Sequence, residues 1–313
     1  MSITIKQYTS ESRDIWNGFN KNSKNGIFMF DRNFMEYHSD RFMDNSLLFF
    51  NDGKLIALLP ASLHGKELRS HGGLTYGGFI VNSEMKQHYM LDCFSYMKEY
   101  MKENNISNFI YKSIPHIYHK QPAEEDLYAL YASNAGIYKI EPSTTIFLSN
   151  PGKIQKGRKA QANRAKREGV VIEPSDDFDT FIKLENTVLS ERHGTKAVHN
   201  ASELKLLNLR FPENIKLFGS FYKGEMIAAA LLFIYETVVH TQYLAANEKA
   251  REIGGLDLLI RTIIEKYSSS KEYFDFGIST EDNGQYLNKG LIAQKEGFGG
   301  RTVCYVTWRL SID

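Results

Sequence analysis

The sequence has few cysteines and no long apolar run, and both absences limit what the protein can be. Two cysteines, Cys93 and Cys304, each lie in an apolar-patterned segment. A disulfide framework or a cysteine metal site needs more cysteines at closer spacing, so we expect two buried, idle thiols. The longest apolar stretch, residues 226–235, is too short to cross a bilayer, and the first residues lack the apolar segment of a secretory signal. These features predict a cytoplasmic protein with no membrane span.

Excess charge and paired histidines are also missing. The chain has 38 Lys and Arg against 37 Asp and Glu, a formal net charge of +1, so overall charge gives no support for nucleic-acid binding. Its nine histidines include no HxxxH or HxH pair, and we expect no metal site. With 313 residues and 42% hydrophobic content, the chain has room for two cores of about 150 residues each.

The hydrophobic pattern of the second half predicts the element order β-α-α-β-β-β-α-β-α-β. The expected strands are 169–174, 215–222, 225–235, 237–246, 272–277 and 300–309, and the expected helices are 176–192, 201–210, 255–269 and 283–294. The helix from 255 rests on Leu256, Leu259, Ile260 and Ile263, which follow the spacing of one helix face directly after Gly254-Gly255.

The first half shows a similar series of elements. Strands are expected at 3–8, 107–112 and 137–148, helices at 10–20, 31–42, 84–103 and 122–134, and a hairpin through Asn51-Asp52-Gly53. A glycine-rich segment, SHGGLTYGGFIV, lies at 70–81. Two similar domains, 1–150 and 151–313, are therefore predicted, joined around Asn150-Pro151-Gly152.

This element order resembles the GNAT acyltransferase fold, and its tandem repetition resembles the FemAB-like branch, which includes the peptidoglycan bridge-forming transferases. The likeness is carried by KGRKAQANRAKREGVVIE at 156–173, ERHGTKAVHNASELKLL at 191–207, YFDFGIS at 273–279, LIAQKEGFGG at 291–300 and the glycine-rich segment. Together these stretches are similar to FemAB-related GNAT proteins associated with bacterial surface polysaccharide synthesis.

The resemblance implies an α+β fold, three-layered α/β, with two tandem GNAT domains, each a mixed, mostly antiparallel sheet flanked by helices. It implies an acceptor cleft without a cofactor in the first domain, and donor binding and catalysis in the second. A glycine pair at a helix start lets a phosphate approach unpaired N–H groups, although such a pair is more often a simple turn. We assign binding of acyl-CoA, the expected co-substrate, to Arg251, Gly254, Gly255, Leu244 and Ala245.

Two positions depart from the pattern of ordinary GNAT enzymes. Leu256 stands where their helix-opening loop ends in a small residue, and Ala293 stands where they tend to place a tyrosine that protonates the leaving thiolate. Lys295 matches a lysine of the FemAB-like branch. It would stabilise negative charge or hold a phosphate; the alternative is a lysine that favours a helix C-terminus.

Several further residues are of the types that acyl transfer to an amine requires. His193 or His199 is suited to act as the base, Arg192 to bind an anionic group, and Glu281 to act as base or ammonium clamp, while Asp282 is suited to cap the following helix. The predicted catalytic residues are Lys295, His193 and Glu281, and the predicted substrate-binding residues are Arg192, His199, His71, Tyr76, Tyr243 and His240. Each has a structural alternative: surface exposure, core packing or a turn.

The basic run from Lys153 to Arg167 contains no acidic residue. It is either a solvated helix face or a contact for phosphates or an RNA backbone. The sequence thus predicts transfer of an acyl group from acyl-CoA, a small-molecule donor, to the amino group of a nucleotide- or lipid-linked amino sugar in surface polysaccharide synthesis.

Two alternatives stay open. One is FemABX-type transfer from aminoacyl-tRNA to a peptidoglycan precursor, disfavoured because no helical-hairpin insertion is visible between 176 and 240. The other is a non-catalytic binding protein.

Overall fold

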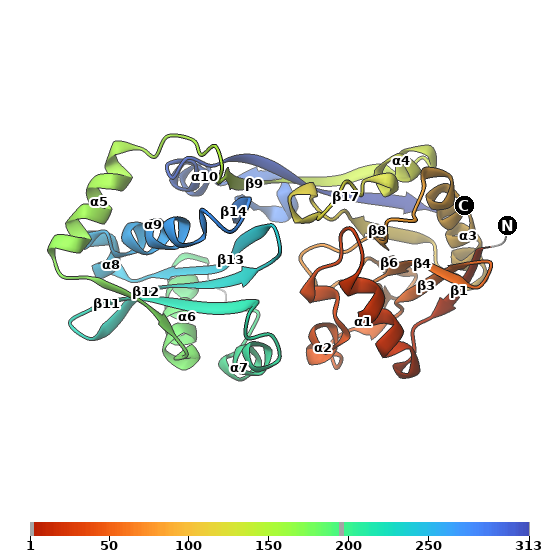
Figure 1. Cartoon of the computed structure of the whole chain (residues 1–313), viewed down its shortest axis with the longest axis horizontal. Helices are drawn as coiled ribbons and strands as arrows, with labels where there is room; N and C mark the ends of the chain where they lie inside the picture. Colours follow the sequence, from red (N-terminus) through yellow and green to blue (C-terminus); the bar gives the residue numbers. More distant parts are fainter. Residues whose placement is uncertain (1–2, 194–196, 313) are drawn as a thin grey trace. The chain divides into compact units, whose positions relative to one another are not determined.

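The computed structural model describes residues 3–193 and 197–312, except for the side chains of 191–193, and divides into two units (Figure 1). The first unit runs to Glu141 and includes Asp282–Gly284 and the residues from Cys304 onward, and the second comprises Pro142–Glu281 and Gln285–Val303. The end of the chain belongs to the first unit because β17 (Arg301–Ser311) pairs there with β8 (Asn108–Lys112). The sequence placed all of 151–313 in the second domain. No helix in the described part of the chain is long and apolar enough to span a membrane.

The second unit is built on a sheet with a single parallel step. Its strands follow the order β10 (Val171–Ser175), β11 (Ile215–Tyr222), β12 (Glu225–Ile234), β13 (Val238–Ala246), β14 (Tyr273–Ile278) and β9 (Gly136–Phe147). Neighbours are antiparallel except for β13 and β14, which run parallel.

Helices cover this sheet on both sides. Helices α5 (Lys156–Arg167) and α9 (Gly255–Tyr267) pack on one side, and α6 (Phe178–His193) lies on the other, followed by α7 (Ala201–Arg210). Because both faces are covered, the strand sequence IAAALLFI of β12 is buried almost throughout. The apolar stripe that predicts α9 faces this core, with Leu259, Ile260 and Ile263 buried.

The first unit contains a four-stranded sheet and a second set of paired strands. One has the order β1 (Ile3–Gln7), β3 (Leu47–Asn51), β4 (Lys54–Leu59) and β7 (Ile80–Val81). The other has the order β17, β8, β6 (Glu67–Arg69), β5 (Ser62–His64) and β2 (Met43–Asp44). Helices α3 (Gln87–Glu103) and α4 (Glu125–Ala132) pack together in this unit, and α3 also contacts β1. The predicted hairpin is confirmed, with Asp52 and Gly53 at φ of 47° and 80°.

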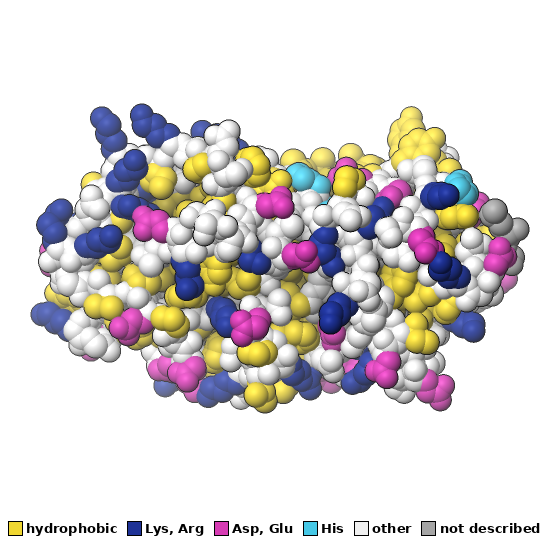
Figure 2. Space-filling view, in the orientation of Figure 1, with side chains coloured by type: hydrophobic (Ala, Val, Ile, Leu, Met, Phe, Trp, Pro, Cys, Tyr) yellow, Lys and Arg dark blue, Asp and Glu magenta, His cyan; other side chains and the backbone are white. Residues whose placement is uncertain are grey.

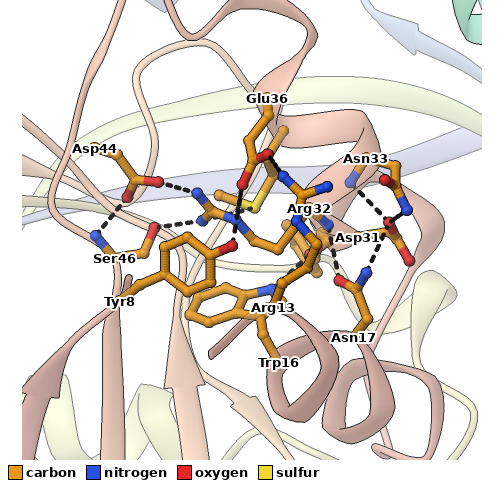
Figure 3. Close-up of polar contacts among 12 residues, drawn as sticks. Tyr8, Arg13, Trp16, Asn17, Asp31, Arg32, Asn33, Glu36, Asp44 and Ser46 are labelled. Atoms are coloured by element: carbon orange, nitrogen blue, oxygen red, sulfur yellow. Dashed lines mark hydrogen bonds and ion pairs between the residues drawn. The ribbon is translucent and has the colours of Figure 1, made fainter. Parts of the chain in front are cut away.

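A buried arginine organises the polar part of the first unit (Figure 3). Arg32 opens α2 (Arg32–Met35), is 2% exposed, and stacks its guanidinium 3.6 Å from the centroid of the Tyr8 ring. It pairs with Glu36 at 3.1 Å and with Asp44. A buried guanidinium needs such partners to offset the loss of water, so Arg32 holds the segment from α2 to β2 against β1.

Most expected elements are present, with three corrections. Only Arg32–Met35 and a short 3-10 turn occupy the helix predicted at 31–42. The helix predicted at 283–294 is α10 (Lys289–Glu296), because Asn283 adopts a left-handed φ of 52° and Asn288 caps the helix start. Residues expected to be a polar link form α8 (Glu248–Ile253). Both thiols are free, but Cys304 is exposed rather than buried. The α+β prediction is confirmed: mixed, mostly antiparallel sheets flanked by helices.

Candidate active site

A pocket of the second unit lies where two neighbouring strands separate. The parallel pairing of β13 with β14 covers Val238–His240 and Tyr273–Asp275 and ends there. Beyond that point Leu244 and Ala246 of β13 and Phe276 of β14 line the pocket, with α9 and α10 closing it. Its volume is about 130 Å³, room for about four water molecules. That size suits the reacting end of a ligand rather than a whole cofactor.

Lys295 lies on the pocket wall and is held by backbone carbonyls. It is 6% exposed in the last turn of α10, and its Nζ donates to Gly277 O at 2.9 Å and Ile278 O at 2.6 Å. These carbonyls lie where the register of β14 with β9 shifts, and Gly277 has a φ of +76°. Burial lowers the pKa of Lys295 to about 8, against the opposing effect of the Asp275 charge. The ammonium can therefore exchange a proton near neutral pH.

A buried histidine–aspartate pair lies where β13 and β14 separate. His240 Nδ1 is 2.7 Å from Asp275 Oδ2, and Ser143 and Thr145 of β9 donate to Asp275 Oδ1 at 2.6 and 2.7 Å. Burial raises the pKa of Asp275, but the bonds from His240, Ser143 and Thr145 outweigh it and lower that pKa to about 2. Asp275 is therefore a fixed negative charge near Lys295.

The histidine ring lies beside the turn that holds Lys295. A Cβ added to Gly277 would lie 3.3 Å from His240 Cε1 and 3.9 Å from Nε2. The carbonyl of the same glycine accepts from Lys295. His240 and Lys295 therefore both lie next to Gly277.

A second cluster of polar side chains lies on the side of β13 that faces α6. Tyr243 OH lies 2.8 Å from His199 Nδ1, and the Tyr243 ring contacts Phe181. Glu185 of α6 is 5% exposed, and burial raises its pKa to about 7. Burial raises the pKa of Tyr243, and the charge of Glu185 raises it further. Val188, one turn further along α6, lines the pocket. A carboxyl that titrates near neutral pH thus lies on this side.

Comparison with known proteins identifies the domain that holds this site. Residues 153–286 match the family described as acetyltransferase (GNAT) domain. These residues are therefore similar to a GNAT acetyltransferase domain. They include His240, Asp275, Tyr243 and Glu185, whereas Lys295 lies just beyond. No curated protein matches the chain.

Solved structures extend the likeness to the whole chain. A crystal structure of FemX superposes with a TM-score of 0.68 at 12% identity, over 99% of this chain and 97% of that one. L-PGS from Bacillus licheniformis gives 0.63 at 13% identity, over 97% and 92%. A tandem GNAT protein from the clavulanic acid biosynthesis pathway gives 0.55 at 10% identity, over 100% and 99%. At such identities the likeness shows the fold, which confirms the FemAB-like tandem GNAT fold inferred from the sequence.

The glycine pair of the GNAT domain is enclosed by helix packing. Gly254 links α8 to α9 at a φ of +83°, and a Cβ added there would lie 2.3 Å from the Gln161 carbonyl of α5. Gly255 is buried under the side chains of Ile227 and Ser220. In the first turn of α9, Asp257 pairs with Arg158 at 3.1 Å. Contact with α5 accounts for Gly254 without a ligand, and Asp257 already occupies the positive end of the helix dipole.

The other residues assigned to the donor and the acceptor are dispersed. Arg251 is exposed and lines the pocket together with Leu244, whereas Ala245 is fully buried. Glu281 is exposed and accepts a hydrogen bond from Asn288 at 2.7 Å. Arg192 and His193 end α6, and their side chains lie outside the described part of the structure.

The predicted acceptor residues of the first unit are buried. His71 is 3% exposed at a φ of +48°, and its Nδ1 accepts from the Gly73 N–H at 3.2 Å. Burial lowers its pKa to about 3, so it is neutral at physiological pH. Tyr76 is 2% exposed and packs against the rings of Tyr118 and Tyr305. Gly73 leaves room for the ring of His38, whose Nε2 would lie 2.4 Å from an added Cβ.

Two groups of this site were missed by sequence reasoning, although each left a signal. Asp275 is a charged residue between two phenylalanines of a buried strand, a position that requires a partner. Glu185 follows Phe181 by one turn on the apolar stripe of α6. A carboxylate on a buried stripe either pairs or shifts its pKa.

Proposed function

We propose that the GNAT domain transfers an acyl group from acyl-CoA to an amino group of a nucleotide- or lipid-linked sugar for surface polysaccharide, in the cytoplasm. The observation that carries this proposal is the pocket at the separation of β13 and β14, with Lys295 on its wall. Beyond His240, β13 is no longer paired with β14, so its backbone can pair with the amides of a donor arm. Arg251, exposed beside the pocket, is placed to meet the donor phosphates in place of the enclosed glycines.

The chemistry needs a proton acceptor and a proton donor on the two sides of the thioester. In our proposal Glu185 takes a proton from the acceptor ammonium, and the free amine attacks the acyl carbon. The carbon–sulfur bond breaks, and Lys295 supplies a proton to the thiolate. The amide nitrogen then gives its remaining extra proton to the neutral Lys295, and Glu185 releases its proton to water. Glu185 must be ionised, above pH about 7, and Lys295 protonated, below pH about 8. The rate should therefore be greatest between these values. His193 and Glu281 stay proposals for the base.

A FemX-type aminoacyl-tRNA donor is the second candidate, and one observation favours it. The glycine turn that would receive the CoA pyrophosphate is covered by α5. The same helix exposes Lys156 and Lys159 to solvent, as contact with an RNA backbone would require.

The two donors are separated by a direct assay. Purified protein is incubated with acyl-CoAs or aminoacyl-tRNA and with amino-sugar nucleotides or lipid-linked amino sugars, and products are read by mass spectrometry. Acyl-CoA turnover is expected, and transfer from aminoacyl-tRNA alone would replace our first donor with the second. Lys295→Met should lower kcat about 100-fold, whereas Lys289→Met, an exposed lysine of the same helix, should leave it unchanged. Equal rates in both variants would contradict the role of Lys295.

A further inference from the structure

A groove in the first unit is lined by positively charged side chains. It lies between α3, the loop after α4, the start of β9 and the end of β17, with a volume of about 670 Å³. Its lining includes Lys98 and Lys102 of α3 and Arg309 of β17, and no Asp or Glu is among the described residues that line it. Such a groove attracts an anion.

These cations are only partly neutralised by the protein. In the part of the chain that the structure describes, neither Lys98 nor Lys102 is paired with an acidic side chain. Arg309 stacks 5.0 Å from the centroid of the Tyr138 ring and lies 3.7 Å from Glu67. Glu67 also binds Arg69 at 2.7 Å. Two lysines one helical turn apart repel each other, and an anionic partner would relieve that repulsion.

A band of exposed apolar side chains borders the groove. The apolar band consists of Tyr128 (54% exposed), Tyr131 (73%), Ile137 (58%), Tyr138 (50%) and Ile140 (42%). Ile137 and Tyr138 also line the groove. Figure 2 shows apolar side chains projecting at the upper right, where Figure 1 labels α4, with basic side chains close by. Scattered exposed apolar residues are ordinary, but several on the consecutive segments α4 and β9, beside a polar rim, mark an interaction site.

We propose that the groove and the apolar band together form a docking surface for a bilayer that contains anionic phospholipids. Tyrosine favours the membrane interface, where its ring meets hydrocarbon and its hydroxyl meets water. Lysines beside it bind anionic headgroups. Single-stranded RNA would use the same cations but stacks on aromatic faces, and the aliphatic Ile137 and Ile140 favour hydrocarbon.

Vesicle flotation tests this surface independently of any acyl donor. The full chain should float with phosphatidylcholine vesicles that contain phosphatidylglycerol, much less with pure phosphatidylcholine vesicles, and less at high salt. Lys98→Glu combined with Lys102→Glu should lower the partition coefficient at least about 30-fold. Tyr131→Ser with Ile137→Ser should lower it as well. All four side chains are partly or fully exposed, so the thermal unfolding curves should match the wild type.

A matched control tests whether positive charge on any exposed helix is enough for binding to anionic vesicles. Lys156→Glu with Lys159→Glu on α5 makes the same change in net charge on another exposed helix, and it should float as the wild type does. Failure of the wild type to float with anionic vesicles would overturn the proposal. So would loss of flotation in the α5 variant but not the α3 variant, or tighter binding of a single-stranded RNA oligonucleotide than of vesicles.

Discussion

Asp275 holds a buried charge at the point where β13 and β14 separate, and Asp275→Asn tests that arrangement. The carboxylate is fully buried and accepts hydrogen bonds from His240, Ser143 and Thr145. Asparagine keeps the size of the side chain but removes the charge and replaces one acceptor with a donor. The variant therefore isolates the electrostatic contribution from the packing.

The magnitude follows from the shift in the Asp275 pKa. In the folded protein this pKa is about 2, and in the unfolded chain it is about 3.9. Because folding lowers this pKa, the ionised carboxylate stabilises the protein at pH values above the unfolded-state pKa, by about 2.6 kcal/mol at pH 7. This contribution is lost as the pH falls through the folded pKa, and at pH 3 about half of it remains.

Urea denaturation of the wild type and the variant at pH 7 and pH 3 measures the effect. At pH 7 the variant should lose about 2–4 kcal/mol in the free energy of unfolding, and at pH 3 the deficit should shrink by about 1 kcal/mol. Asp176→Asn, an exposed carboxylate of the same unit, should change stability by less than about 0.5 kcal/mol. A deficit equal at both pH values, or none at pH 7, would refute the assignment of a fixed charge to Asp275.

Two further substitutions probe the glycine turn and the proposed base. Gly254→Ala should destabilise the protein by about 2–4 kcal/mol, because it combines a left-handed φ with a clash against Gln161. Gly157→Ala, at a position of α5 where an added Cβ meets no neighbour, should be neutral or slightly stabilising. Equal melting temperatures of the two variants would contradict this account. Glu185→Gln should slow transfer and remove the rise in rate through pH about 7. Because folding raises the pKa of Glu185 from 4.5, its stabilising contribution is present below pH about 4.5 and is lost as the pH rises through about 7. The variant should therefore gain about 2–3 kcal/mol in the free energy of unfolding at pH 8 but little at pH 5; the same gain at both would count against the buried carboxylate.

Local patterns predicted the elements with strong periodicity. The helix after Gly254-Gly255, the strands of the second sheet and the hairpin at Asp52-Gly53 all lie close to where the sequence placed them. Predictions failed where local polarity was ambiguous. The segment 247–253 reads as a polar link, yet Asn247 caps a short helix there, and Asn283 breaks the helix expected at 283–294.

Some of the residues assigned from the sequence line the pocket, and their roles stay predictions. Lys295 was assigned because it matches a lysine of the FemAB-like branch. In the structure it lies on the pocket wall and, like His240, next to Gly277. Asp275 was not identified, because its partners Ser143 and Thr145 come from a strand about 130 residues earlier. No local pattern reveals such a pairing.

The sequence by itself determined most of the element order, the tandem repetition and the residue types from which a site could form, because the spacing of apolar residues along the chain shows helix and strand periods. Only the tertiary structure decided which of them meet. Strand register brings His240 to Asp275, burial moves the pKa values of Glu185 and Lys295 toward neutrality, and the approach of α5 explains Gly254. These effects depend on distance and on loss of water, which arise only when remote segments pack together.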